Sequence, residues 1–288
     1  MKRRAFIAGL GSAAVWPMVA GAQQPAKLWR IGMLETIPPE LNVANLAALR
    51  RGLRELGYVE DRNYLLVYRS ADGQPEQFPH LAEELVRAQV DIIITRGTPA
   101  TRAARAATST IPIVIAAIGE ALGVIDSLAR PGGNVTGMSA FTTELAAKRV
   151  ELLNELLPNT VRIAYLHNIS NPVAPLQWEQ TEAAARQLGI SAELYDVRTR
   201  DDIGRAVEAA IVKRIDALFV GNDSITQENR SLTAELATRN HLPTVFSAQE
   251  FVEAGGLLSY SASYPQLYYK SAKLVDKILR GAKAGVAS

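Results

Sequence analysis

The alternation of short β-branched runs with helical segments is the sequence feature that most constrains how this chain can fold. Residues 90–95 and 111–118 are almost continuously apolar and rich in isoleucine and valine. Such runs are typical of parallel strands that are covered on both faces. Segments such as 42–56 instead place an apolar residue at every third or fourth position, which predicts a helix with one buried face. Strands that alternate with helices through short connections predict a doubly wound parallel sheet.

The second half of the chain repeats this pattern, and the whole chain holds more elements than one small sheet needs. Strands are expected at 29–34, 64–70, 90–95, 111–118, 161–166, 191–197, 217–220, 243–246 and 257–261, and helices at 42–56, 76–88, 99–107, 143–157, 177–188, 201–213, 227–240 and 265–280. We therefore expect an α/β protein with two doubly wound parallel-sheet lobes joined by a hinge. The turn-rich segment 130–137 near the midpoint is either the approach to that hinge or an ordinary surface turn.

The N-terminal segment 1–22 has the composition of an export signal. It combines a basic start, an interrupted apolar stretch at 5–19 and a small-residue cleavage site that ends at Ala22. Its paired arginines fit either general secretion or a twin-arginine signal. Residues 9–14 match the G-x-G-x-x-A dinucleotide pattern, but they lie inside the signal rather than between a strand and a helix, so we expect no nucleotide cofactor.

Composition excludes several classes of site. The chain contains no cysteine, so disulfides, thiolate metal sites, cysteine nucleophiles and a lipid-anchoring cysteine are impossible. Removal of residues 1–22 takes away three basic residues and leaves 28 basic against 29 acidic ones. The overall charge therefore gives no support for a nucleic-acid partner.

Sequence motifs for catalysis are absent. The three histidines, His80, His167 and His241, belong to no zinc-binding, serine-hydrolase or P-loop motif. Glu120 and Asp223 follow predicted strands and form a carboxylate pair that an exported hydrolase could use. We expect a binding protein without catalysis, cofactor or metal ion, and the hydrolase stays open as an alternative.

The residues that follow the predicted strands are small and rich in hydrogen-bonding groups. Ligands of doubly wound sheets bind beyond the carboxyl ends of the strands. The candidate ligand-binding residues at these ends are Thr36, Gly97, Thr98, Pro99, Gly119, Glu120, Asn168, Asn171, Asn222, Asp223 and Ser247.

Several of these candidates have an alternative structural role. Thr98 either caps a helix that begins at the next residue or, with the free N–H groups of that helix, holds a ligand carboxylate. Asp223 either balances a ligand ammonium group or caps the following helix. Asn168 and Asn171 are cleft donors or turn formers, and His167 is either a cleft residue or a structural surface residue.

Four segments carry a family resemblance: 57–63 (GYVEDRN), 128–137 (LARPGGNVTG), 250–260 (EFVEAGGLLSY) and 276–283 (DKILRGAK). Together they resemble the ABC-transporter substrate-binding proteins that include tryptophan-type binding proteins and have the type I periplasmic-binding fold. The resemblance implies a first lobe of residues 27–140 plus 262–288, a second lobe of residues 141–261, and a solute between them. It also places Ser139, which joins the ligand-binding candidates, with Phe141 and Thr142 beside the first crossover.

The resemblance further implies a role outside the cytoplasm. We expect a periplasmic monomer that captures an amino acid or related carboxylate, aromatic ones included, and delivers it to a membrane permease. A ligand-sensing partner of a membrane receptor is a further alternative. The chain departs from the family pattern at Glu120-Ala121, where relatives carry aspartate-proline. Many relatives also continue past the position of Lys283 with a strand and a helix, so we expect one lobe to lack an edge element or one crossover to be absent.

Overall fold

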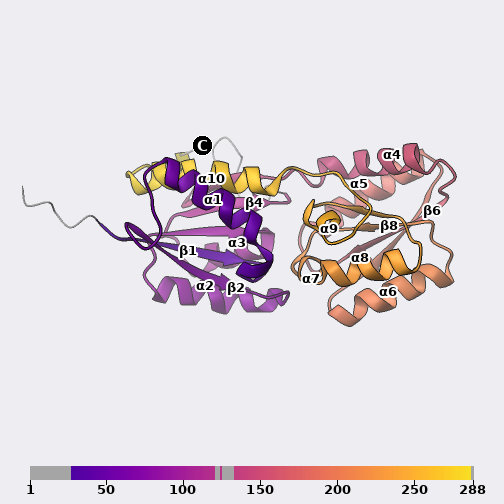
Figure 1. Ribbon diagram of the computed structural model, residues 1–288, viewed down its shortest axis with the longest axis horizontal. Helices are drawn as coiled ribbons and strands as arrows, with labels where there is room; N and C mark the ends of the chain where they lie inside the picture. The colour runs from indigo at the N-terminus through magenta and orange to yellow at the C-terminus, as the bar shows by residue number, and fades with distance from the viewer. Residues whose placement is uncertain (1–26, 121–123, 125–132, 287–288) are drawn as a thin grey trace, which may run out of the picture.

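The first lobe is a parallel five-stranded sheet with helices on both faces. The computed structural model describes residues 27–120, 124 and 133–286. Its first sheet has the order β2 (Tyr64–Ser70), β1 (Trp29–Glu35), β3 (Ile92–Arg96), β4 (Ile113–Ile118) and β5 (Val135–Ser139). Helices α1 (Val43–Glu55) and α10 (Tyr264–Leu279) cover one face, and α2 (Phe78–Arg87) and α3 (Thr98–Ala107) cover the other (Figure 1).

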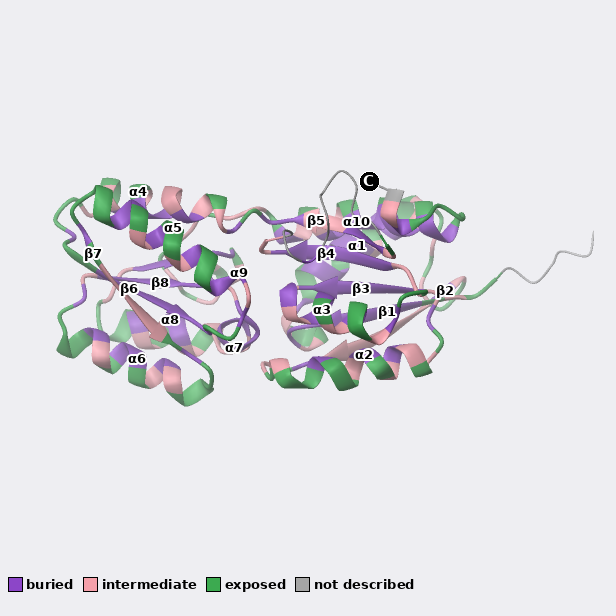
Figure 2. Cartoon of the chain, turned by 180° about the vertical axis from the view of Figure 1, so that it is seen from behind, coloured by how far each residue is buried: buried purple, intermediate pink, exposed green. Residues whose placement is uncertain are grey.

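Alternation along the central strands explains this layering. Ile92 and Ile94 belong to the core under α1 and α10, whereas Ile93 belongs to the core under α2 and α3. Both faces of the strand are therefore buried, as its continuous apolar run predicts (Figure 2). Gly52 lets α1 approach α10 closely, because a Cβ there would lie 2.7 Å from the Tyr269 carbonyl oxygen.

The second lobe repeats the architecture. Its parallel sheet has the order β10 (Leu258–Ser259), β9 (Thr244–Phe246), β8 (Ala217–Val220), β6 (Arg162–His167) and β7 (Ser191–Asp196). Helices α4 (Glu144–Leu156) and α5 (Ala174–Gln187) cover one face, and α6 (Arg200–Val212) and α8 (Arg230–Arg239) cover the other. The short helices α7 (Ser224–Glu228) and α9 (Glu250–Glu253) lie at the side that faces the first lobe (Figure 1). The predicted fold of two parallel-sheet lobes is confirmed.

Among the described residues, the chain passes between the two sheets twice, from β5 to α4 and from β10 to α10. Arg149 of α4 ties these two connections together. It is 4% exposed, and its guanidinium donates to the Thr142 carbonyl of one connection at 3.0 Å and to the Tyr260 carbonyl of the other at 2.8 Å. The lobes are therefore joined by a pair of segments that lie side by side.

Two local predictions are corrected by the structure. Residues 135–137 of the turn-rich segment belong to strand β5, which pairs with β4 through a register shift. Gly137 makes this pairing possible, since a Cβ there would lie 2.4 Å from the Ile115 carbonyl oxygen. The helix expected at 227–240 is split at Asn229 into α7 and α8. The export-signal prediction for 1–22 and the pattern at 9–14 lie outside the described residues. None of the helices in the described ranges has the length and apolar character needed to cross a membrane.

Candidate functional site

The switch points of the two sheets face one shared cleft. The strand order reverses between β1 and β3 in the first sheet and between β6 and β8 in the second, and ligands of doubly wound sheets bind at such points. The cleft is lined by Thr36, Arg96, Gly97, Thr98, Pro99, Ala117, Gly119, Thr142, Asn171, Val173, Gln177, Asn222, Asp223, Ser224 and Tyr264. The sequence candidates brought together here are Thr36, Gly97, Thr98, Pro99, Gly119, Asn171, Asn222 and Asp223.

The wall from the first lobe contains a helix start without a side-chain cap. Gly97 precedes α3 with a φ of 85°, a conformation that suits glycine, and makes no side-chain capping bond. Helix α3 begins at Thr98, so the prediction that Thr98 caps a helix starting one residue later is wrong. The Thr98 and Thr36 hydroxyls are buried and have no hydrogen-bond partner among the described residues. A helix start without a side-chain cap, next to hydroxyls that have no partner, favours the binding of an anion.

The wall from the second lobe is already hydrogen-bonded. Asp223 is 4% exposed, and its carboxylate caps α7 by accepting from the Ile225 N–H at 3.0 Å. The Thr226 hydroxyl completes the capping box by accepting from the Asp223 N–H at 3.0 Å. Asn171 donates its side-chain amide to the other carboxylate oxygen at 2.7 Å. The capping role predicted for Asp223 is confirmed, and this residue also lines the cleft.

The two walls carry opposite charges. Of the described residues that line the cleft, Arg96 is the cationic one and Asp223 the anionic one. Burial acts to lower the pKa of Arg96, but the acidic groups of Tyr268, Glu250 and Glu35 outweigh burial and raise that pKa. Arg96 therefore keeps its positive charge although its side chain is only 3% exposed.

A further hydrogen-bonded chain lines the cleft beside the first connection. The Gln177 amide donates to the Thr142 hydroxyl, and the Tyr165 hydroxyl donates to the Gln177 carbonyl oxygen at 2.6 Å. Gly119 adjoins this chain, and a Cβ at that position would lie 2.7 Å from the Thr142 hydroxyl oxygen. Glycine therefore lets the lobes meet here.

The remaining sequence candidates lie outside this cleft. Glu120 lines a small adjoining hollow, and Asn168 lines a neighbouring one while accepting from the backbone N–H two residues later at 3.0 Å. Ser139 accepts from the N–H two residues later at 3.1 Å, and Ser247 donates to a carbonyl of β8 at 3.2 Å. His167 is fully buried, so the surface position expected for it is wrong, and burial lowers the pKa of its imidazole.

The residues that sequence reasoning missed share a simple property: they do not begin a loop after a strand. They are Arg96, Ala117, Val173, Gln177 and Tyr264. Thr142, which the resemblance places beside the first crossover, and Ser224, which follows the strand-end candidate Asp223, also line the cleft. Arg96 is the last residue of β3 and directly precedes Gly97, and this adjacency was the signal available for it. Gln177 and Tyr264 lie in helices, and no strand-end argument reaches them.

Known proteins with related sequences include substrate-binding proteins of ABC transporters. The model of the family described as ABC transporter substrate binding protein matches residues 39–287. A tyrosine-binding protein of Clostridioides difficile (strain R20291) is 26% identical over 249 residues, which is 86% of this chain and 71% of the relative.

Two solved structures superpose closely on this chain. An ABC domain from Streptococcus pneumonia in complex with L-Trp gives a TM-score of 0.81 at 27% identity, covering 90% of this chain and 87% of that one. A conserved domain protein from Vibrio cholerae O1 biovar eltor gives a TM-score of 0.82 at 26% identity, covering 90% and 88%. Because the family model covers most of the sequence, this chain belongs to the ABC transporter substrate-binding proteins.

Proposed function

We propose that this protein captures a zwitterionic amino acid, and an aromatic one in particular, outside the cytoplasm for an ABC importer. The observation that carries the proposal is the pair of opposite charges on the two walls. Arg96 and the open start of α3 suit a ligand carboxylate, and Asp223 suits a ligand ammonium group. The tyrosine-binding relative and the L-Trp complex support an aromatic amino acid.

The mechanism we propose is binding coupled to closure of the two lobes. The cleft is narrow, because its open volume of about 30 Å³ has room for only a few waters. An amino acid would therefore enter when the lobes are apart, and contacts with both walls would then favour the closed state. The closed protein, acting as a monomer, would dock on the membrane permease. The segment 1–22 would direct its export.

The exported-hydrolase alternative draws no support from the arrangement of its two carboxylates. Glu120 lines a different hollow from Asp223, and the Asp223 carboxylate is engaged by Ile225 and Asn171. The comparisons likewise describe solute-binding proteins. We infer a non-enzymatic role in which the solute leaves the protein unchanged.

The test is a thermal-shift and calorimetric comparison of L-tyrosine and L-tryptophan with two truncated analogues of tyrosine. Tyramine lacks the carboxylate, and 3-(4-hydroxyphenyl)propionate lacks the ammonium group. The amino acids should stabilise the protein by about 2.7 kcal/mol at a hundredfold excess over Kd, and both analogues should bind at least tenfold more weakly. Failure of every amino acid to bind would overturn the proposal, and so would conversion of the solute over hours.

A further inference from the structure

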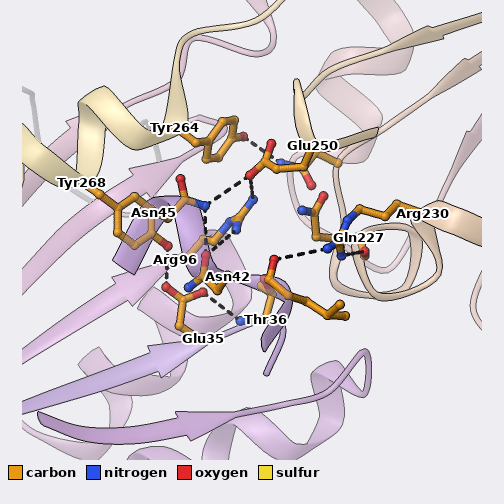
Figure 3. A network of polar contacts seen from close by, with 12 residues as sticks. Glu35, Thr36, Asn42, Asn45, Arg96, Gln227, Arg230, Glu250, Tyr264 and Tyr268 are labelled. Carbon is orange, nitrogen blue, oxygen red and sulfur yellow. Dashed lines mark hydrogen bonds and ion pairs between the residues drawn. The ribbon is translucent and has the colours of Figure 1, made fainter. Parts of the chain in front are cut away.

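Arg96 is held from across the cleft by a residue of the other lobe. Its guanidinium donates to Glu250 of α9 at 3.0 Å (Figure 3). The two side chains are 3% and 12% exposed. Arg96 lines the cleft, whereas Glu250 is not among the described residues that line it.

Other contacts make this link a small network between the lobes. The Asn45 amide of α1 donates to the same Glu250 carboxylate oxygen at 3.2 Å and to the Asn42 side-chain oxygen at 2.9 Å. Arg230 of α8 donates to the Leu41 carbonyl at 3.2 Å. One carboxylate oxygen of the second lobe thus accepts from two side chains of the first (Figure 3).

Groups of the first lobe and of its connecting helix fix the guanidinium on its other sides. The Tyr264 ring lies 4.8 Å from the Arg96 guanidinium carbon, and the Asn42 side-chain oxygen accepts from it at 3.5 Å. When the lobes part, Glu250 leaves with the second lobe and these first-lobe groups stay behind. The orientation of Arg96 therefore depends on the distance between the lobes.

We propose that Glu250 is a positioning residue that couples lobe closure to ligand capture by holding Arg96 toward the cleft in the closed state alone. The proposal rests on the proposed function for the role of Arg96 toward the ligand carboxylate. Glu250 is not among the described residues that line the cleft, so its proposed role acts through Arg96. An ion pair that forms only on closure shifts the equilibrium toward the closed state, and a ligand that binds the closed state gains apparent affinity as the population of that state rises.

The test compares Glu250→Gln with Glu253→Gln, which removes the same charge from an exposed position of the same helix. Because the chain has no cysteine, Glu83→Cys in α2 and Glu208→Cys in α6 give two unique spin-label sites on exposed positions of different lobes. In the ligand-free protein, Glu250→Gln should move the label–label distance distribution toward longer distances, whereas Glu253→Gln should leave it unchanged. The Kd for L-tryptophan or L-tyrosine should rise about tenfold in Glu250→Gln and stay within about twofold in Glu253→Gln.

A second variant changes the network on the side of the first lobe. Asn45→Asp places a carboxylate against Glu250 and should open the lobes in the same way, which guards against a folding defect in one variant. Equal distances and equal affinities in Glu250→Gln and Glu253→Gln would overturn the inference. Absence of amino acid binding in the unmodified protein would instead overturn the proposed function, and the label distances would still decide whether Glu250 holds the lobes closed.

Discussion

Helices α3 and α7 both start at the cleft, but their first N–H groups are capped in different ways. Helix α7 of the second lobe is capped by the Asp223 carboxylate, whereas α3 of the first lobe follows Gly97 and has no side-chain cap. A capped helix start has no need of a ligand, whereas α3 has no side-chain cap and the Thr98 hydroxyl beside its start has no partner in the described part of the chain. The comparison teaches that the start of α3 suits an anion, whereas the start of α7 is closed by a carboxylate that other hydrogen bonds hold in place.

This difference has an energetic consequence for each lobe. A buried hydroxyl without a partner costs about 1–3 kcal/mol, so the unpaired hydroxyls of the first-lobe wall lower its stability, and a ligand that hydrogen-bonded them would remove this cost. The hydrogen bonds to Asp223 instead stabilise the second lobe whether or not a ligand is bound. Substitutions in the first-lobe wall should therefore lower ligand affinity without lowering stability. Substitution of Asp223 should lower both.

The largest effect is expected for Asp223→Ala. It removes the partner proposed for a ligand ammonium group and the cap of α7, so the Kd for L-tyrosine should rise about 100-fold and stability should fall by about 1–2 kcal/mol. Isothermal calorimetry and urea unfolding measure these quantities. The matched control is Thr199→Ala, which removes the cap of α6 in the same lobe away from the cleft. It should lose similar stability and keep its affinity; equal loss of affinity in both variants would show that capping alone explains Asp223.

An intermediate effect is expected for Thr98→Val, which exchanges the hydroxyl for a methyl group of similar size. Since this hydroxyl has no partner among the described residues, stability should stay constant or rise by up to about 1 kcal/mol, whereas affinity should fall about tenfold. Thr101→Val in the same helix is the contrast, because the Thr101 hydroxyl donates to the Gly97 carbonyl at 2.9 Å. It should lose about 1–2 kcal/mol of stability and bind normally. A loss of stability in Thr98→Val would contradict the open-wall interpretation.

The smallest effect concerns Glu35, which lies behind the first-lobe wall and accepts from the Tyr268 hydroxyl. Burial raises the pKa of Glu35 above its ordinary value of 4.5, although Arg96 and the Tyr268 hydrogen bond oppose the rise. The folded protein thus holds this proton more tightly than the unfolded chain. The contribution of Glu35 to stability is complete below pH 4.5 and is lost as the pH rises through the raised pKa. The free energy of unfolding of Glu35→Gln, relative to the unmodified protein, should therefore increase from pH 4 to pH 8.

For Glu84→Gln, the free energy of unfolding relative to the unmodified protein should change with pH in the opposite direction. The hydrogen bond from Arg69 lowers the pKa of Glu84, so its contribution is present above pH 4.5 and is lost as the pH falls. Urea unfolding at several pH values should give slopes of opposite direction for the two variants. A flat difference for Glu35→Gln would show that Arg96 keeps Glu35 ionised in the folded protein.

The fold could be predicted from the sequence because the patterns that define it are local: β-branched runs predict the strands, and apolar residues at every third or fourth position predict the helices. Continuous β-branched runs predict strands buried on both faces, and strand ends at a switch point predict where Thr36, Gly97 and Asp223 lie. The prediction did not reach Arg96, whose partner Glu250 lies 154 residues away in the chain. Ser139 ends strand β5 and Ser247 follows β9, but their hydroxyls bond nearby backbone groups, and the residue type alone does not distinguish that use from ligand binding.

The hydrogen bonds of Arg149 to both connections determine where the two lobes can rotate against each other. The two connecting segments, held side by side by Arg149, form one narrow strap. A rotation of one lobe against the other would therefore turn about this strap. For a given rotation, two facing groups separate in proportion to their distance from the strap. The Thr142–Gln177 contact, which lies beside the first connection, should part least, and contacts farther along the cleft should part most. Small rotations about the strap would thereby become ångström-scale changes at the end of the cleft farthest from it.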